Sequence, residues 1–138
     1  MKTKTTFIAR YSETDQMGII HHSTYPVWFE VGRTNFLKTA GHSNTDIESR
    51  GILLPLYEMN CQFKVPAKFE DELIVETCIK NISRVRVIFS YKVINCSNHT
   101  LIATGETMHA WTNHSLKPIN IEKVASDIYL SLMRVFKE

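Results

Sequence analysis

A carboxylate, a glycine and a histidine lie close together in the segment RYSETDQMGIIHHSTYPVWFEVGRTNFLKTAG, which covers residues 10–41. Asp15 precedes Gly18 and His22, and the residues that follow have the pattern of an amphipathic helix. The first turn of a helix presents unpaired backbone N–H groups and a partial positive charge, which can polarise a carbonyl oxygen. A carboxylate beside that end could attack the carbonyl carbon or activate water. The segment is therefore a candidate site for acyl transfer.

The same residues also have an ordinary structural interpretation. Asp15 can cap a turn, Glu13 can be solvated, and His21 and His22 can simply flank the helix. Gly18 suits a turn in either case, because glycine adopts backbone conformations that other residues resist. Residue spacing alone leaves both interpretations open.

The chain has none of the common catalytic signatures. It contains no GxSxG elbow, P-loop or GxGxxG motif, and neither His109 nor His114 belongs to an HExxH sequence. No cluster of His, Cys, Asp or Glu has metal-ligand spacing, so we expect no bound metal. For His42, His99 and His114 we expect surface or structural roles.

Three cysteines, Cys61, Cys78 and Cys96, are scattered along the sequence. An odd set without a CxxC pair favours neither a disulfide framework nor a zinc site. Each cysteine lies in a strand-like run. We therefore expect small buried apolar residues in a protein of the reducing cytoplasm.

Length and charge narrow the class of protein. The 138 residues suit a single domain that covers residues 1–138. A net charge of +2, from 16 basic and 14 acidic residues, gives no support for a nucleic-acid or membrane partner. We expect no signal peptide and no membrane span, because the sequence lacks an apolar run of sufficient length.

Hydrophobic periodicity predicts a central helix over residues 23–40 and a second amphipathic helix over residues 120–136. Ser23 or Thr24 can cap the central helix, and Gly41 can end it. The apolar faces consist of Tyr25, Trp28, Phe29, Gly32 and Phe36 in the central helix, and of Ile121, Val124, Ile128, Leu132 and Val135 in the second.

A short helix and five strands complete the predicted elements. Thr45 and Glu48 have capping-box spacing within residues 44–51, where we predict the short helix. The strands are predicted at residues 3–11, 54–65, 72–82, 85–96 and 101–113.

Short connectors join the last four predicted strands, which favours antiparallel pairing. A single long sheet has one face that must be covered, and the central helix is the obvious cover. We therefore predict an α+β fold in which a long curved antiparallel sheet wraps around a central α-helix. One helix cannot cover five strands completely, so we also expect association with another copy of the chain.

The segment YSETDQMGIIHHSTYPVWFEVGRTNFL resembles the hotdog-fold acyl-CoA thioesterases of the 4-hydroxybenzoyl-CoA thioesterase-like family. The family pattern is Y-x-x-x-D-x-x-G-x-x-x-H-x-x-Y followed by a helical E-x-x-R pair. It is met in register by Tyr11, Asp15, Gly18, His22, Tyr25, Glu30 and Arg33. Two later segments, RGILLPLYEMNCQFKVPAKFEDELIVET and GETMHAWTNHSLKPINI, resemble the second and last strands of the family. The resemblance spans residues 5–121.

The resemblance implies that Asp15 is the catalytic carboxylate, as a nucleophile or as a base for water. Backbone N–H groups at or near His22 would hold the thioester oxygen, and the His22 side chain would help to position substrate or water. Tyr11 would lie beside the carboxylate, although a packed strand residue is the alternative. Glu30 and Arg33 are expected to form a structural pair. No cofactor is implied.

The resemblance also implies a slot for the acyl chain between the helix and the sheet of two protomers. Candidate residues are Tyr25, Trp28, Phe29, Tyr57 and Met59, although such apolar stripes are more often core. Gly18 is a separate candidate, because it lets the chain approach the substrate closely. Lys64, Arg84 and Arg86 could bind the phosphates of coenzyme A, with a solvated strand edge as the alternative. We expect Arg84 and Arg86 to share a strand face.

The sequence therefore favours a thioesterase that hydrolyses acyl-CoA to a free acid and coenzyme A. An acyl carrier protein substrate is an alternative, because both carriers present a phosphopantetheine arm. A non-catalytic acyl-thioester-binding module is a second alternative, and a dehydratase of the same fold is disfavoured. We expect a homodimer joined edge to edge through its sheets, or a homotetramer of two such dimers.

Overall fold

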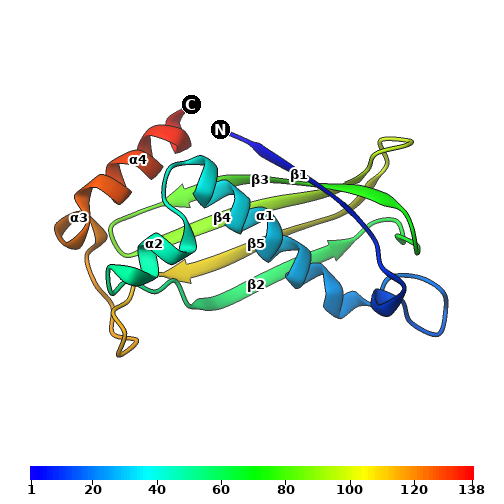
Figure 1. The fold of residues 1–138 in the computed structure, drawn as a ribbon, viewed down its shortest axis with the longest axis horizontal. Coiled ribbons are helices and arrows are strands. Elements are labelled where there is room, and N and C mark those ends of the chain that lie inside the picture. The colour runs from blue at the N-terminus through cyan, green and yellow to red at the C-terminus, as the bar shows by residue number, and fades with distance from the viewer.

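A computed structural model describes all 138 residues (Figure 1). The five strands are β1 (Thr3–Ile8), β2 (Leu56–Phe63), β3 (Glu72–Ile82), β4 (Arg86–Asn95) and β5 (Leu101–Ala110). The helices are α1 (Tyr25–Thr39), α2 (Asn44–Ser49), α3 (Ile121–Val124) and α4 (Ser126–Lys137), with the short 3-10 turns η1 (Tyr11–Glu13) and η2 (His22–Thr24) before α1. The predicted order of elements is confirmed.

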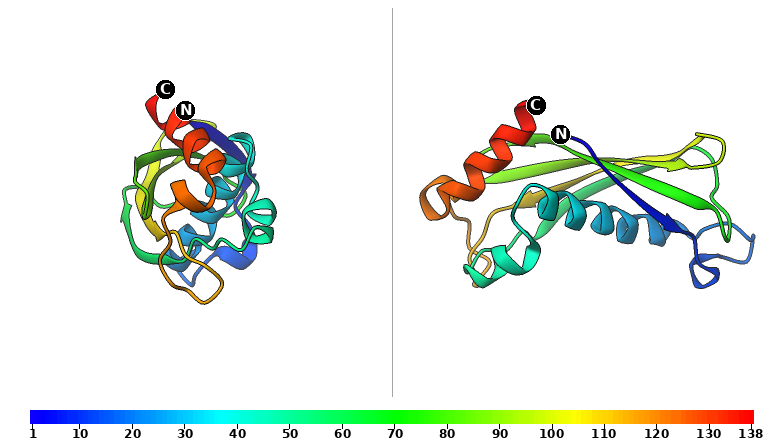
Figure 2. Two further views of the ribbon diagram at one scale, coloured as in Figure 1. Left: turned by 90° about the vertical axis from the view of Figure 1, so that its left-hand side faces the viewer. Right: turned by 45° about the horizontal axis from the view of Figure 1, so that its top comes forward.

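All five strands pair antiparallel in one sheet of order β1-β3-β4-β5-β2, so β1 and β2 form its two edges. Along β3, β4 and β5, buried residues alternate with more exposed ones, as expected for a sheet covered on one face. Figure 2 shows the sheet arched over α1, which lies on its concave side. The predicted α+β architecture is therefore confirmed.

Aromatic packing holds α1 against the sheet. Phe29 stacks on Tyr91 of β4 with ring centroids 4.5 Å apart, and Phe36 contacts Phe89 edge-on at 5.8 Å. Gly105 of β5 makes room for the Phe29 ring, because a Cβ atom at that position would overlap it. Phe29, Phe36 and Phe89 are fully buried, and truncating such a side chain to alanine costs about 3–5 kcal/mol.

The start of α1 differs from the prediction. Residues His22–Thr24 form η2, and the α-helix itself begins at Tyr25. Neither Ser23 nor Thr24 caps the helix with its side chain. Instead, His21 Nδ1 accepts a hydrogen bond from the Ser23 backbone N–H at 3.1 Å. The histidine ring thus takes the capping role that we assigned to a hydroxyl group.

The short helix α2 is present, but a different residue caps it. Ser43 Oγ accepts a hydrogen bond from the Asp46 backbone N–H at 3.1 Å. Ser43 has extended backbone angles, as an N-cap residue requires. The predicted capping box of Thr45 and Glu48 is therefore wrong, because the helix begins earlier than that pair allows.

The predicted C-terminal helix is divided at Ala125, whose φ of −149° and ψ of 72° are not helical. The break keeps Ile121 buried beneath the β3–β4 turn, where its N–H donates to the Arg84 carbonyl at 2.9 Å. Helix α4 then packs against β3 (Figure 1). Because of this change of direction, Val124 is 53% exposed and not on the buried face as predicted.

The cysteines Cys61, Cys78 and Cys96 are free and only partly buried, so the prediction of fully buried residues is wrong. Cys78 shows the reason. It alternates with the buried Thr77 and Ile79 along β3, and so it lies on the outer face of the sheet, which no helix covers. None of the helices combines the length and the apolar character needed to cross a membrane.

Candidate active site

Residues 13–21 form a small hairpin that leads into α1. At its base, the His21 N–H donates to the Glu13 carbonyl at 2.8 Å. Closer to its turn, the Asp15 N–H donates to the Ile19 carbonyl, also at 2.8 Å. The hairpin therefore presents Asp15 from a backbone fixed on both sides, directly beside the start of the helix.

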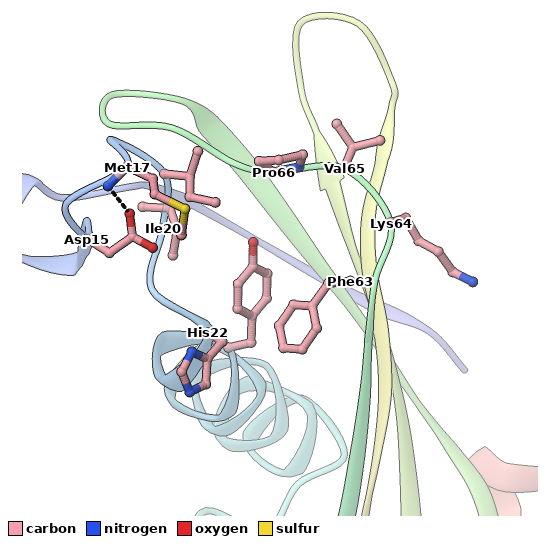
Figure 3. A pocket seen from close by; sticks show the side chains of 10 residues that line it. Asp15, Met17, Ile20, His22, Phe63, Lys64, Val65 and Pro66 are labelled. Atoms are coloured by element: carbon pink, nitrogen blue, oxygen red, sulfur yellow. Dashed lines mark hydrogen bonds between the residues drawn. The ribbon is translucent and has the colours of Figure 1, made fainter.

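The turn of this hairpin orients the Asp15 carboxylate. Gly18 has φ of +79°, a conformation that strains other residues, and its N–H donates to the Asp15 carbonyl at 3.1 Å. The Met17 N–H donates to Asp15 Oδ1 at 2.8 Å (Figure 3). Oδ2 makes no hydrogen bond within the chain, and the residue is only partly buried. One oxygen thus fixes the carboxylate while the other is free to act on a ligand.

His22 provides a second group with unused capacity. Its backbone N–H makes no hydrogen bond within the chain, as expected at the first turn of a helix. Its side chain is exposed and stacks on His21 with ring centroids 4.2 Å apart. The N–H and the partial positive charge of the helix start can stabilise a negative oxygen.

Asp15 and His22 line a common cavity of about 340 Å³. Figure 3 shows the two side chains near each other at one side, with the end of β2 and the following residues at the other. The lining residues are Asp15, Met17, Ile19, Ile20, His22, Tyr25, Phe63, Lys64, Val65 and Pro66. Six of the ten are hydrophobic, so the cavity suits an apolar group that carries a reactive centre near the carboxylate.

Tyr25 forms a buried aromatic part of the cavity wall. It is 3% exposed and packs edge-on against Phe63 of β2, with ring centroids 5.1 Å apart, and against Trp28 at 4.9 Å. Burial raises the pKa of the Tyr25 hydroxyl, while a hydrogen bond with the Ala67 backbone acts in the opposite direction. The hydroxyl therefore stays neutral and can act as a hydrogen-bond donor.

Lys64 contributes the cation at the rim of the cavity. Its side chain extends away from Asp15 in Figure 3, and its Nζ atom donates to Gln62 Oε1 at 3.0 Å. Lys64 is exposed and forms no ion pair with an acidic side chain. It is therefore available to an anionic group of a ligand outside the cavity.

Several predicted site residues lie outside the cavity lining. Tyr11 is 74% exposed and packs edge-on against Phe69 at 5.5 Å, so its place in catalysis stays a prediction. Trp28 and Phe29 belong to the core, with 3% and 0% of their surface exposed. Met59 lies further along β2, where it is partly buried against the core. The space left by Gly105 explains why Phe29 points into the sheet and not into the cavity.

Arg84 and Arg86 lie at the opposite end of the sheet from the cavity, beside the β3–β4 turn. Arg84 precedes β4, so the prediction that the two arginines share a strand face is wrong. Arg84 Nε donates to Glu122 Oε1 at 2.7 Å, and the Arg86 guanidinium lies 5.8 Å from the centre of the Tyr57 ring. Both groups are engaged within the chain, and the structure does not bring them together with Asp15.

Glu30 and Arg33 do not form the predicted pair. Glu30 is exposed, whereas Arg33 Nη1 donates to the Tyr91 hydroxyl at 3.1 Å. The guanidinium is thus turned beneath the helix, toward the polar hydroxyl on β4. An i, i+3 spacing permits a surface ion pair but does not compel one when a buried acceptor lies nearer.

Glu13 is the residue that sequence analysis missed. It is 8% exposed, and its Oε2 accepts a hydrogen bond from the Trp28 indole N–H at 3.1 Å. Its Oε1 accepts the Arg10 backbone N–H at 2.8 Å. The only local signal for this role is the three-residue spacing from Arg10, at which a glutamate can return to a backbone N–H.

Known proteins resemble this chain in both sequence and fold. The sequence pattern of the thioesterase-like superfamily matches residues 9–128, which include the hairpin, α1, the whole cavity lining and strands β2–β5. The chain belongs to the thioesterase-like superfamily. It is accordingly a thioester hydrolase, and the resemblance to the 4-hydroxybenzoyl-CoA thioesterase-like group is confirmed.

Individual members of the superfamily agree with this assignment. YneP of Bacillus subtilis, whose name gives it provisionally as an acyl-CoA thioesterase, is 34% identical over 118 residues, which are 86% of either chain. The DHNA-CoA thioesterase of Staphylococcus aureus is 31% identical, with a TM-score of 0.93 over 97% of this chain and 90% of that one. A 4-hydroxybenzoyl-CoA thioesterase, at 18% identity and a TM-score of 0.82, covers 95% of this chain and 98% of that one and shares the hotdog fold.

Proposed function

We propose that this thioesterase hydrolyses acyl-CoA thioesters, with Asp15 as the catalytic carboxylate and the His22 backbone N–H as the donor to the thioester oxygen. The observation that carries the proposal is the pairing of a free carboxylate oxygen with an unpaired N–H among residues that line one apolar cavity. The relatives YneP and the Staphylococcus aureus enzyme, both named for CoA thioesters, support coenzyme A as the carrier.

In one route, Asp15 activates water. The carboxylate takes a proton from water while the water oxygen bonds to the thioester carbon, and the carbonyl oxygen becomes an oxyanion beside the His22 N–H. The carbon–sulfur bond then breaks, and Asp15 returns the proton to the departing thiolate. One water is consumed, and the products are a carboxylic acid and free coenzyme A.

In the other route, Asp15 is the nucleophile. A carboxylate oxygen bonds to the thioester carbon, the carbon–sulfur bond breaks, and the thiolate leaves with a proton from solvent. Water then hydrolyses the mixed anhydride and restores the carboxylate. Rapid quenching followed by mass spectrometry of the peptide that contains Asp15 separates the routes, because only this one adds the acyl mass to that peptide.

The other groups of the cavity suit binding. The His22 imidazole would position substrate or water, and the apolar wall with Tyr25 and Phe63 would hold the acyl group. Gly18, which we predicted to contact the substrate, does not line the cavity, and its part is to allow the turn that orients Asp15. Lys64 at the rim would face the phosphates of coenzyme A, which lie at the far end of the pantetheine arm from the thioester.

We also propose that the protein is a homodimer joined along β2, or a tetramer of such dimers. Strand β2 is an edge of the sheet, so one side of its backbone is unpaired. Leu56, Tyr57 and Phe63 on this strand are 44–55% exposed. An unpaired edge strand that exposes apolar side chains is a template for pairing with another chain. Light scattering behind a sizing column measures the mass, and a monomer would contradict this part of the proposal.

The test of the function is thiol release from short, medium, long and aromatic acyl-CoAs by the wild type and Asp15→Asn. We expect hydrolysis of at least one acyl-CoA and its collapse in the variant, whose shape and turn hydrogen bond are retained. Activity with acyl carrier protein alone would replace the proposed carrier. Tight acyl-CoA binding without thiol release would instead indicate a binding module.

A further inference from the structure

Glu13 is a buried carboxylate that ties three segments together. Its two side-chain oxygens accept hydrogen bonds from the backbone N–H of Arg10, after β1, and from the indole N–H of Trp28, on α1. Its backbone carbonyl accepts the His21 N–H at the base of the hairpin. The Glu13 side chain is 9% exposed, and the Arg10 guanidinium lies 3.6 Å from Oε2.

The position of Glu13 relates these bonds to the reaction centre. Glu13 stands two residues before Asp15, on the same strand of the hairpin. Trp28 stands one helical turn after Tyr25, which lines the cavity and follows His22. The indole hydrogen bond thus connects the segment that carries the carboxylate with the helix that carries the unpaired N–H.

The hairpin has a second, independent attachment. The Ile20 N–H donates to the Ala67 carbonyl at 2.9 Å, and Ile19 forms a bridge with Lys68. Loss of the Glu13 side-chain bonds would therefore leave the hairpin attached along one strand only. Such a hairpin can pivot and still remain folded, which separates an effect on geometry from an effect on folding.

We propose that Glu13 is a positioning residue: through Trp28 and Arg10, its carboxylate sets the place of the Asp15 carboxylate relative to the His22 N–H. This inference rests on the proposed function. The expected signature is a loss of kcat with little change in KM, because the transition state depends on the relative position of the two groups while the apolar cavity still binds the acyl chain. A displacement of about 1 Å in a reacting group can cost about 100-fold in rate.

The first test is Glu13→Gln, which keeps the size of the side chain. An amide presents one oxygen and one NH₂ group, so it can accept from only one of the two donors that face Glu13. We expect a fall in kcat of about 10- to 100-fold with KM nearly unchanged. A folded variant that retains wild-type kcat, or one that changes KM alone, would overturn the proposal.

The second test is a double-mutant cycle with Trp28→Phe, which removes the indole N–H and keeps an aromatic ring. Both variants act on the same connection between hairpin and helix, because Trp28→Phe removes its donor and Glu13→Gln leaves one acceptor for two donors. We therefore expect the double variant to lose no more kcat than the more affected single variant. Losses that add fully would mean that the two residues act separately and would contradict the proposal.

The matched control is Leu132→Ala on α4, a fully buried residue at the other end of the molecule. It destabilises the fold without touching the hairpin, so we expect a lower melting temperature at unchanged kcat. If kcat falls in proportion to the melting temperature in all three variants, Glu13 has only a structural role.

Amide hydrogen exchange tests the anchor without reference to activity. In Glu13→Gln we expect faster exchange at Arg10 and His21, with α4 unchanged. This result would support the positioning role even if Asp15→Asn retained full turnover, in which case the proposed function alone would fail. Unchanged exchange at both amides would overturn the inference whatever the activity.

Discussion

Two polar clusters contact α1, and they differ in whether their hydrogen-bonding groups are used up within the protein. In the core, hydrogen bonds run from Arg33 to Tyr91, then to Thr107 and His109, and end at the Leu54 carbonyl. Each bond has a donor and an acceptor if His109 is neutral, with Nδ1–H donating to the carbonyl and Nε2 accepting the Thr107 proton. None of the four side chains in this series of hydrogen bonds lines the cavity at the start of the helix.

The cluster at the start of the helix has the opposite property. Asp15 Oδ2 and the His22 backbone N–H have no partner in the chain, and both residues line a cavity. In the core cluster, burial and the nearby positive charge of Arg33 lower the pKa of His109 to about 4. This residue has the strongly shifted pKa but is only 1% exposed, so a ligand does not reach it. A strongly shifted pKa therefore indicates an active site only where the group also meets a cavity and retains bonding capacity.

The largest expected effect is a contrast between two variants: Asp15→Asn should lower the activity, and His109→Gln should lower the stability. Asp15→Asn should lower kcat about 100-fold or more, because it removes the base or nucleophile, and should leave the melting temperature nearly unchanged. His109→Gln should cost about 1–3 kcal/mol of unfolding free energy, because buried groups lose their partners, at nearly unchanged kcat. Denaturant unfolding and thiol release on the same preparations measure both. A large kcat loss in His109→Gln would place the core chain in the reaction and break the comparison.

The next effect is an acid-dependent loss of stability. The unfolded chain binds a proton on His109 near pH 6.5, whereas the folded protein resists protonation until about pH 4. The stabilising contribution is therefore fully present above pH 6.5 and is lost as the pH falls toward 4. A displacement of this size amounts to about 3 kcal/mol.

Urea unfolding of the wild type and of His109→Gln at several pH values isolates this contribution. Glutamine does not titrate, so the stability advantage of the wild type should shrink steadily between pH 6.5 and 4. The ion pair of Arg50 with Asp127 provides a separate reference. It lowers the pKa of Asp127 to about 2, so its contribution fades only below the His109 window. If the unfolding free energies of the two proteins differ by a constant amount between pH 6.5 and 4, His109 is not a neutral buried histidine.

The open cluster was predictable from sequence because it is local. Asp15, Gly18 and His22 lie within eight consecutive residues, and the apolar stripe that follows them shows that a helix comes next in the chain. The β3–β4–β5 part of the sheet was also predictable, since short connectors favour antiparallel pairing of consecutive strands. The place of β2 was not, because β2 pairs with β5 and not with β3, which follows it in the chain. The predicted ends of the helices were wrong: the His21 side chain caps η2 before the central helix, and Ala125 breaks the C-terminal helix.

The role of Glu13 and the environment of Arg84 depend on contacts that no local pattern contains. Glu13 is buried because Trp28, fifteen residues later, offers an indole N–H. Arg84 is paired because Glu122, thirty-eight residues later, lies in the first turn of α3 beside the β3–β4 turn. A charged residue in a sequence is normally solvated, and only the packed fold shows which ones are not.

The smallest expected effect concerns the cations at the two ends of the sheet. Lys64 lies at the rim of the cavity, whereas Arg86 lies at the far end against Tyr57. Lys64→Ala should raise KM for an acyl-CoA by about 2- to 5-fold, because an exposed cation contributes at most about 1 kcal/mol to binding a phosphate. It should leave KM unchanged for the corresponding N-acetylcysteamine thioester, which lacks the phosphates. Because exposed charges are screened, added salt should erase the difference between wild type and variant.

Arg86→Ala is the matched control, since it removes one positive charge from the same sheet without touching the cavity. We expect the same KM as the wild type for both substrates. A KM increase confined to acyl-CoA in Arg86→Ala, with none in Lys64→Ala, would mean that the phosphates bind at the far end of the sheet. In an edge-to-edge dimer that end could belong to the other copy, so mixed dimers carrying Asp15→Asn in one chain and Arg86→Ala in the other would then decide which copy supplies the arginine.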